Sequence, residues 1–110
     1  MQDIIKIDDV KEAFSLINKF LIKTPLVYSP EFSEITGNKI YFKLENFQLT
    51  HAFKIRGALN KIFNLNKAQK EKGVIAASSG NHALGVAYIS KLLGVEANVV
   101  MPMKAPSTKI

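Results

Sequence analysis

The stretch "GVIAASSGNHALGVAY", residues 73–88, decides the fold. It opens with a short apolar run at residues 74–77, which is typical of a buried strand in a parallel sheet. Residues 83–93 are apolar on almost every side, which predicts a buried helix closed by Gly94. A second apolar run follows at residues 97–101. Strand, helix and strand in this order predict an α/β fold whose parallel strands are joined by helical crossovers.

The sequence before this stretch predicts two helices with clear start and stop signals. Asp9, with Glu12 three residues later, resembles a capping box, and the helix that it opens ends before Thr24-Pro25. Ser29-Pro30 offers an N-cap with proline at the first helical position, and Gly37 offers a left-handed stop, so a helix of two turns lies between them. The apolar face of the first helix is Val10, Ala13, Phe14, Ile17 and Leu21.

A strand and further helices complete the expected order. Residues 39–45 alternate apolar and polar side chains, which predicts a strand. After a turn at residues 46–50, an amphipathic helix opens at Lys54 and runs toward Gly73. Its apolar stripe is Ile55, Ala58, Leu59, Ile62 and Phe63. Near the end of the chain, Ala105-Pro106-Ser107 is typical of the first turn of one more helix.

Length and composition limit the classes of function. With 110 residues, the chain is one small domain or a piece of a larger protein, and 47% hydrophobic against 22% charged residues indicates a globular chain. The lack of cysteine excludes disulfides and thiolate chemistry, and two histidines make a metal site unexpected. The first residues show no signal sequence and no apolar run approaches a membrane span, so we expect a cytoplasmic protein with no membrane partner.

The net charge of +6 is concentrated in the middle of the chain. Residues 39–72 carry eight basic side chains against two acidic ones, with five aromatic side chains among them. Basic residues interleaved with aromatics can bind nucleic acid. However, Phe42 alternates with apolar neighbours and Phe63 falls on the helical stripe, so both are expected in the core. We therefore expect no nucleic-acid partner.

The loop after residues 74–77 is a candidate binding site, because ligands of open α/β sheets bind beyond the carboxyl ends of the strands. Ser78, Ser79, Gly80 and Asn81 place small side chains and backbone N–H groups at the start of a helix, where anions bind. The same residues could instead only cap the helix and form its turn, and that alternative stays open. Neither G-x-G-x-x-G nor G-K-[ST] is present, so the anion need not be a nucleotide.

Lys54 is a candidate for covalent chemistry because of its place in the first turn of a helix. The positive end of the helix dipole and desolvation by apolar neighbours such as Phe53 both favour the neutral form of an amine. A neutral amine is what an imine-forming lysine needs. The alternative is a solvated lysine beside a core phenylalanine.

Three segments of the chain carry a resemblance to one enzyme family. They are "KLENFQLTHAFKIRGA" (residues 43–58), "GVIAASSGNHALGVAY" (residues 73–88) and "VVMPMKAPSTK" (residues 99–109). In this order and spacing they resemble the N-terminal part of fold type II pyridoxal-phosphate enzymes, the threonine dehydratase and serine racemase group. The resemblance extends from about Thr24-Pro25-Leu26 to the end of the chain. It implies pyridoxal 5'-phosphate as the cofactor and a fragment of the two-domain fold of the tryptophan synthase β type.

The resemblance implies roles for residues of two motifs. In the family, the lysine that matches Lys54 forms the Schiff base with the cofactor, and the aromatic residue that matches Phe53 packs near the cofactor ring. The asparagine that matches Asn81 contacts the phenolic oxygen of that ring. In racemising members, the serine that matches Ser79 is an acid–base group on the face opposite the lysine. Backbone amides of the loop bind the substrate carboxylate, and the matching residues are Ser78, Ser79, Gly80, Asn81 and His82.

The first motif also contains residues without an implied chemical role. Arg56 and Gly57 match the family pattern, and Arg56 is expected to be structural, pairing with a local carboxylate or capping carbonyls. His51 and Ala52 stand where many members have Gly and Ser. Both substitutions look tolerable, although they put the hydrogen bonding of this turn in question.

The implied activity converts a hydroxy amino acid, threonine or serine, to a 2-oxo acid and ammonia, with Lys54 removing the Cα proton. The resemblance implies that residues 1–72 begin the large cofactor domain and residues 73–110 begin the small domain, with the remainder of both absent. The 110 residues are then expected to be inactive alone. A serine racemase-type isomerase and a non-catalytic, self-associating fragment are the alternatives. A homo-oligomer acting in amino-acid metabolism, such as isoleucine biosynthesis, completes the expectation.

Overall fold

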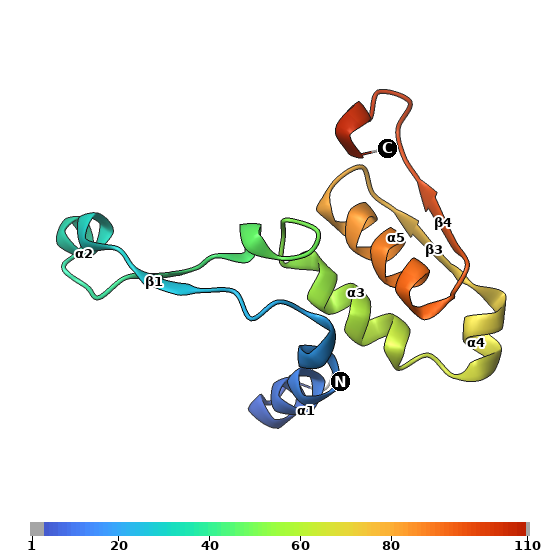
Figure 1. The fold of residues 1–110 in the computed structure, drawn as a ribbon, viewed down its shortest axis with the longest axis horizontal. Helices are drawn as coiled ribbons and strands as arrows, with labels where there is room; N and C mark the ends of the chain where they lie inside the picture. Colours follow the sequence, from blue (N-terminus) through green and yellow to red (C-terminus); the bar gives the residue numbers. More distant parts are fainter. Residues whose placement is uncertain (1–3, 110) are drawn as a thin grey trace.

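The computed structural model describes residues 4–109 and shows a helical body from which a narrow arm projects (Figure 1). The helices of the body are α1 (Ile7–Ile17), α3 (Lys54–Phe63), α4 (Lys67–Lys72) and α5 (Asn81–Leu93). Its strands are β3 (Val74–Ala77) and β4 (Ala97–Val100). The arm contains β1 (Leu26–Tyr28), α2 (Pro30–Thr36) and β2 (Tyr41–Lys43). Short 3₁₀ helices are η1 (Asn18–Phe20), η2 (Glu45–Phe47) and η3 (Ser107–Lys109).

The β3–α5–β4 unit confirms the predicted α/β pattern. β3 and β4 pair in parallel, and α5 makes the connection between them. α5 begins at Asn81, two residues before the predicted start, and ends where Gly94 adopts a left-handed conformation with φ 65°. Its burial is one-sided, because Tyr88 and Leu92 are exposed. The prediction of a helix buried on almost all sides is therefore wrong.

The strand predicted at residues 39–45 lies in the arm, not in the parallel sheet. It is shortened to β2, which pairs antiparallel with β1. Phe42 is expected in the core, yet it is exposed and packs edge-on against Phe32, with ring centroids 5.3 Å apart. β1 has no counterpart among the sequence predictions, because three residues are too few to show a period.

The long helix expected from Lys54 toward Gly73 is interrupted. α3 ends at Phe63, and residues 64–66 connect it to α4. At the start of α4, the Gln69 N–H donates to Asn66 Oδ1 at 2.9 Å, and the Asn66 N–H donates to Gln69 Oε1 at 3.0 Å. This reciprocal capping box favours a new helix start over continuation of α3.

Helix boundaries elsewhere follow the predicted signals in part. α2 begins at Pro30 and ends at Thr36, and the predicted stop Gly37 follows with a left-handed φ of 67°, as expected. α1 begins at Ile7, before the predicted cap Asp9, whose carboxylate accepts a hydrogen bond from the Lys6 N–H at 2.7 Å. Of the helix expected to start at residues 105–107, the described residues contain the single turn η3.

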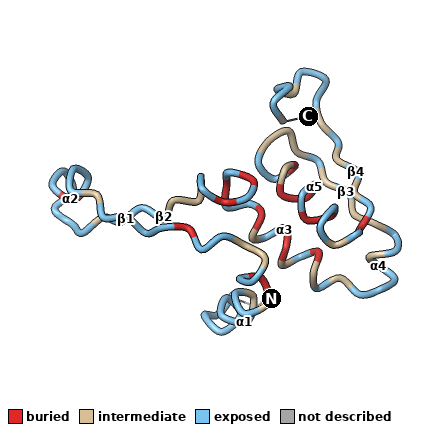
Figure 2. The backbone as a smooth tube through the Cα atoms, in the orientation of Figure 1, coloured by how far each residue is buried: buried red, intermediate tan, exposed pale blue. Residues whose placement is uncertain are grey.

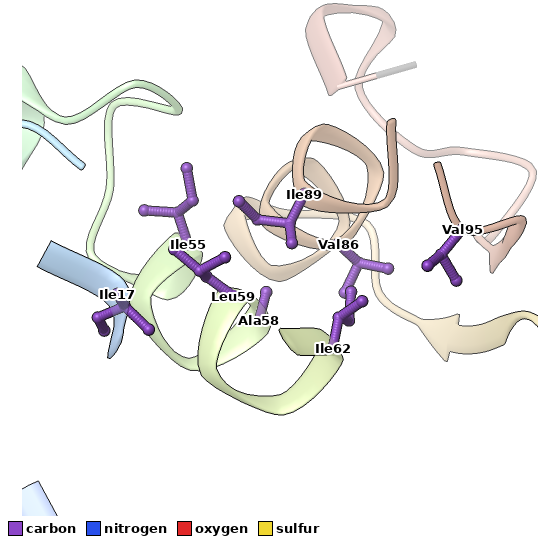
Figure 3. Packing of buried hydrophobic residues seen from close by; sticks show 8 residues of the cluster. All are labelled: Ile17, Ile55, Ala58, Leu59, Ile62, Val86, Ile89 and Val95. Carbon is purple, nitrogen blue, oxygen red and sulfur yellow. The ribbon is translucent and has the colours of Figure 1, made fainter. Parts of the chain in front are cut away.

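The core lies between α3 and α5 (Figures 2 and 3). Its buried side chains are Ile17, Ile55, Ala58, Leu59, Ile62, Val86, Ile89 and Val95. The predicted stripe of α3 is thus confirmed, and Phe63 packs against the cluster as expected. The predicted apolar face of α1 is buried only at Ile17, since Val10 and Phe14 are exposed.

The structure of residues 4–109 also bears on membrane spans and metal sites. No helix among residues 4–109 combines the length and the apolar character that a membrane span requires. The same residues contain no group of three or more His, Asp or Glu side chains that could hold a metal ion.

Candidate active site

Lys54 is the first residue of α3, as predicted, and its side chain is exposed. Its Nζ lies 5.4 Å from the centre of the Phe53 ring, which is itself exposed. Within the part of the chain that the structure describes, Lys54 makes no ion pair with a carboxylate. The amine is therefore accessible at a helix start. Residues 4–109 do not supply the apolar surroundings that were expected to desolvate it.

The buried side chain of Gln48 stabilises the turn before Lys54. The Gln48 side chain is 1% exposed, and its Oε1 accepts hydrogen bonds from the Ile22 N–H at 3.0 Å and the Leu49 N–H at 3.1 Å. Its Nε2 donates to the Ile22 carbonyl at 3.0 Å. The side chain thereby joins the segment before β1 to the segment before α3. Sequence reasoning misses this residue, because a glutamine in a turn is usually exposed.

An ion pair fixes the first turn of α3. Arg56 Nε donates to Glu45 Oε2 and Arg56 Nη2 donates to Glu45 Oε1, both at 2.8 Å, which confirms that Arg56 pairs with a local carboxylate. The Thr24 hydroxyl also donates to Glu45, and Lys43 Nζ donates to the Thr24 carbonyl at 2.6 Å. The hydrogen bond from Arg56 lowers the pKa of Glu45 to about 2. This network anchors α3 two residues after Lys54.

His51 occupies a backbone position that suits glycine. Its φ is 55°, in the left-handed region, where a residue with a Cβ is strained by about 1–2 kcal/mol. The His51 N–H donates to the Gln48 carbonyl at 2.8 Å, and His51 Nδ1 lies 3.3 Å from the Asn46 carbonyl oxygen. The turn is therefore hydrogen-bonded with histidine in place, although the strain favours glycine at this position.

The loop between β3 and α5 forms the second part of the candidate site. The Ser78 N–H donates to the Val100 carbonyl at 3.0 Å, and the Gly80 N–H donates to Ser78 Oγ at 3.3 Å. Ser78, Ser79 and Gly80 are half-buried, whereas Asn81 and His82 are exposed. Since α5 starts at Asn81, its first N–H groups have no acceptor within the helix. The start of α5, more than Ser78, therefore offers donors to an anion.

α3 and α5 meet at the residue that follows Lys54. A Cβ placed on Gly85 of α5 would lie 3.2 Å from Ile55 N and 3.4 Å from the carbonyl carbon of Lys54. Asn81 precedes Gly85 by four residues and lies on the same face of α5. The structure therefore brings the starts of α3 and α5 to one side of the core (Figure 1). Sequence reasoning misses Gly85, although a glycine inside a helix signals close packing.

His82 is set apart from the other predicted site residues. It lines a hollow of about 380 Å³ together with Gly57, Lys61 and Val74 among others. Neither Lys54 nor Asn81 lines this hollow. A role for His82 in the candidate site would therefore come from its backbone N–H at the start of α5.

Comparison with known proteins decides the family. Residues 17–110 match the family described as "Pyridoxal-phosphate dependent enzyme". The chain belongs to this family. The predicted resemblance is thus confirmed, and so is the predicted α/β fragment of a fold type II enzyme, because solved members of the family share this fold.

Individual relatives of this pyridoxal-phosphate family member are long enzymes. The chain is 48% identical over 106 residues to an L-threonine ammonia-lyase of Thermotoga maritima and 51% identical over 107 residues to a catabolic L-threonine dehydratase, TdcB, of Staphylococcus aureus. Each alignment covers 96% of this chain but 26% and 31%, respectively, of the relative. Maize serine racemase matches with a TM-score of 0.87 and 45% identity, over 94% of this chain and 32% of that one. The chain thus spans about a third or less of these relatives.

Proposed function

We propose that the protein is a pyridoxal-phosphate-dependent ammonia-lyase that converts threonine or serine to a 2-oxo acid and ammonia. The observation that carries the proposal is the accessible amine of Lys54 at the start of α3. The backbone there packs closely against α5 at Gly85. Two relatives that are 48% and 51% identical to this chain, an L-threonine ammonia-lyase and an L-threonine dehydratase, support the reaction class. The S. aureus relative is named catabolic, so it gives no support to the expected place in isoleucine biosynthesis.

The residues present fit the cofactor. Its aldehyde requires a primary amine that is not committed to an ion pair, and among residues 4–109 Lys54 meets that condition. The exposed ring of Phe53 lies next to this amine and offers apolar surface to an aromatic ring. Asn81, at the start of α5, is the residue proposed to contact the phenolic oxygen. When bound, pyridoxal phosphate supplies an electron sink for negative charge that develops at the substrate Cα.

The residues of this chain would then bind and orient the substrate. The first N–H groups of α5 and the positive end of its dipole would hold the substrate carboxylate beyond the loop of residues 78–82. Fixing the carboxylate at one point limits the directions in which the Cα–H bond can point. Lys54 Nζ, as a free amine at the start of α3, would accept the Cα proton as general base.

The proposed enzyme needs more surface than these residues provide. Ile75 of β3 and Val100 of β4 are 76% and 57% exposed, and parallel sheets are normally covered on both faces. We therefore propose that residues 1–72 begin the large domain and residues 73–110 the small one, and that the 110 residues are inactive alone. A cytoplasmic homo-oligomer is part of the same proposal, and the exposed apolar side chains of the arm suit subunit contacts.

A chimera tests the proposed function. In the chimera, the matching part of this chain replaces the 106 aligned residues of the T. maritima ammonia-lyase. We expect the chimera, with pyridoxal phosphate, to release a 2-oxo acid and ammonia in equal amounts from L-threonine or L-serine, measured by coupled dehydrogenase assays. The 110 residues alone are expected to release neither product. A chimera that is folded and binds the cofactor but deaminates neither substrate would overturn the proposal.

A serine racemase-type isomerase is the second candidate, and the structural match to the maize racemase favours it. In that case Ser79, half-buried after β3, is proposed to exchange a proton on the face opposite Lys54. Ser79→Ala in the chimera is expected to lower D-serine formation by about 10²-fold or more while ammonia release persists. Chiral chromatography measures D-serine, and ammonia is measured on the same samples. Equal loss of both products would contradict a separate acid–base role for Ser79.

A further inference from the structure

Gly85 occupies an unusual position for a glycine. It is the fifth residue of the 13-residue helix α5 and is buried. In the interior of a helix, glycine is less favourable than alanine, because its backbone loses more freedom on folding. Gly57, in the interior of α3, has open space where a Cβ would lie, so glycine is not sterically required there. Gly85 therefore has a packing requirement that Gly57 lacks.

That requirement comes from the backbone of α3. A Cβ on Gly85 would lie 3.2 Å from Ile55 N, 3.3 Å from Ile55 Cα and 3.4 Å from the carbonyl carbon of Lys54. These three atoms belong to the main chain, so no change of side-chain rotamer could relieve the contact. A methyl group at this point would force α3 and α5 apart by a few tenths of an ångström.

The neighbouring contacts would direct this displacement onto Lys54. Ile55 and Ile89, one turn after Gly85 on the same face, are fully buried in the core, as Figure 3 shows. Arg56 is tied to Glu45 by two hydrogen bonds of 2.8 Å. The first turn of α3 is thus held on the side of Glu45 and on the side of α5. A shift at Gly85 changes the position of Lys54 relative to the start of α5.

We propose that Gly85 is a positioning residue for Lys54: it permits backbone contact between α5 and α3 and so sets the separation of Lys54 from the amino end of α5. The role in catalysis rests on the proposed function, in which Lys54 holds the cofactor and the start of α5 holds the substrate carboxylate. The geometric part stands without it, because it concerns only the packing of two helices.

The first experiment tests the geometry in the full chain without cofactor. In Gly85→Ala, we expect the amide resonances of Ile55 and Arg56 to shift more than others in α3, and the Arg56 amide to exchange with solvent at least about threefold faster. Val95→Ala is the matched control, because it truncates a core side chain on the other side of the cluster from Ile55, as Figure 3 shows. Unchanged resonances at Ile55 and Arg56, or equal changes in Val95→Ala, would overturn the proposal.

The second experiment tests the consequence for Lys54 in the chimera. The amount of pyridoxal phosphate bound to Lys54 is measured by reducing the linkage with borohydride and mapping the labelled peptide. Gly85→Ala is expected to slow capture and to lower kcat by about threefold to tenfold with little change in KM, because small misplacements of a reacting group are costly. Val95→Ala is expected to stay within about twofold, since distant sites act independently. Capture and kcat at wild-type levels in Gly85→Ala would overturn the positioning role.

A double variant separates position from stability. Gly57→Ala adds a better helix former to α3 in open space, so it offsets lost stability without restoring the helix separation. The defect at Lys54 is expected to persist in Gly85→Ala/Gly57→Ala; full recovery would show that only stability had been lost and would overturn the proposal. If the wild-type chimera captures no cofactor, the proposed function fails, while the resonance and exchange data on the full chain still decide the geometry at Gly85.

Discussion

Lys54→Ala is expected to lower ammonia release from threonine by the chimera by about 10³-fold or more, because it removes both the proposed attachment point of the cofactor and the proposed general base. After borohydride reduction, the peptide that contains residue 54 is also expected to carry no bound cofactor in this variant. The amine is exposed and makes no ion pair with the described residues, so its removal leaves no buried charge behind. Stability should therefore change little, and the loss of activity can be attributed to chemistry.

Lys61 provides the matched control for this prediction. It lies in the same helix, is also an exposed lysine, and borders the hollow near His82 instead of the start of α3. Lys61→Ala is expected to leave activity within about twofold, as exposed substitutions away from a site usually do. Trapping of the cofactor on Lys61, or activity that survives in Lys54→Ala, would contradict the assignment of Lys54. A small primary amine added to Lys54→Ala should restore part of the proton transfer if Nζ is the base.

The elements that could be predicted from the sequence are those set by contacts within a short segment. The stripe of α3 from Ile55 to Ile62, the strand and helix on either side of the loop at residues 78–80, and the glycine stops at Gly37 and Gly94 all depend on local periodicity or on a local backbone conformation. The place of Lys54 at a helix start belongs to the same class. These features are confirmed because tertiary contacts agree with the local preference.

The features that could not be predicted depend on partners far apart in the sequence. Gln48 is buried because it binds the backbone of Ile22, and Glu45 is important because Thr24 and Arg56 converge on it. No periodicity marks such contacts. The same reasoning explains Phe42: alternation predicts which face of a strand it occupies, but not whether another layer covers that face.

The candidate site shows both kinds of information together. The types of residue at Lys54 and Asn81 could be recognised from motifs, whereas the contact that brings their helices together depends on Gly85, more than 20 residues from Lys54 in the chain. A motif states which groups are needed, and the packing of α3 on α5 determines how far apart they lie. Variants at Gly85 and Lys54 therefore test different parts of one arrangement.

Acidification is expected to weaken the fold through Glu45. In the folded chain the hydrogen bond from Arg56 lowers the pKa of Glu45 from 4.5 to about 2. A depressed carboxyl pKa contributes stability that is fully present above about pH 4.5 and is lost as the pH falls toward about 2. The size of the shift corresponds to about 3 kcal/mol of unfolding free energy. Because the Glu45 and Arg56 side chains are only 15% and 28% exposed, solvent screens this pair less than a surface pair.

Glu45→Gln tests this ion pair directly. The variant keeps the shape of the side chain but leaves the guanidinium of Arg56 without a counter-charge, so at pH 7 its free energy of unfolding in urea is expected to fall by about 2–4 kcal/mol. It should also lose the part of the acid dependence that lies between pH 4.5 and about 2. Glu71→Gln is the control, since the Lys67–Glu71 pair spans 3.9 Å between exposed side chains and is worth little. An acid dependence in Glu45→Gln equal to that of the wild type would show that Glu45 does not carry it. Since Arg56 lies two residues after Lys54, the same variant should also loosen the first turn of α3, which links the stability of this ion pair to the position of the proposed catalytic amine.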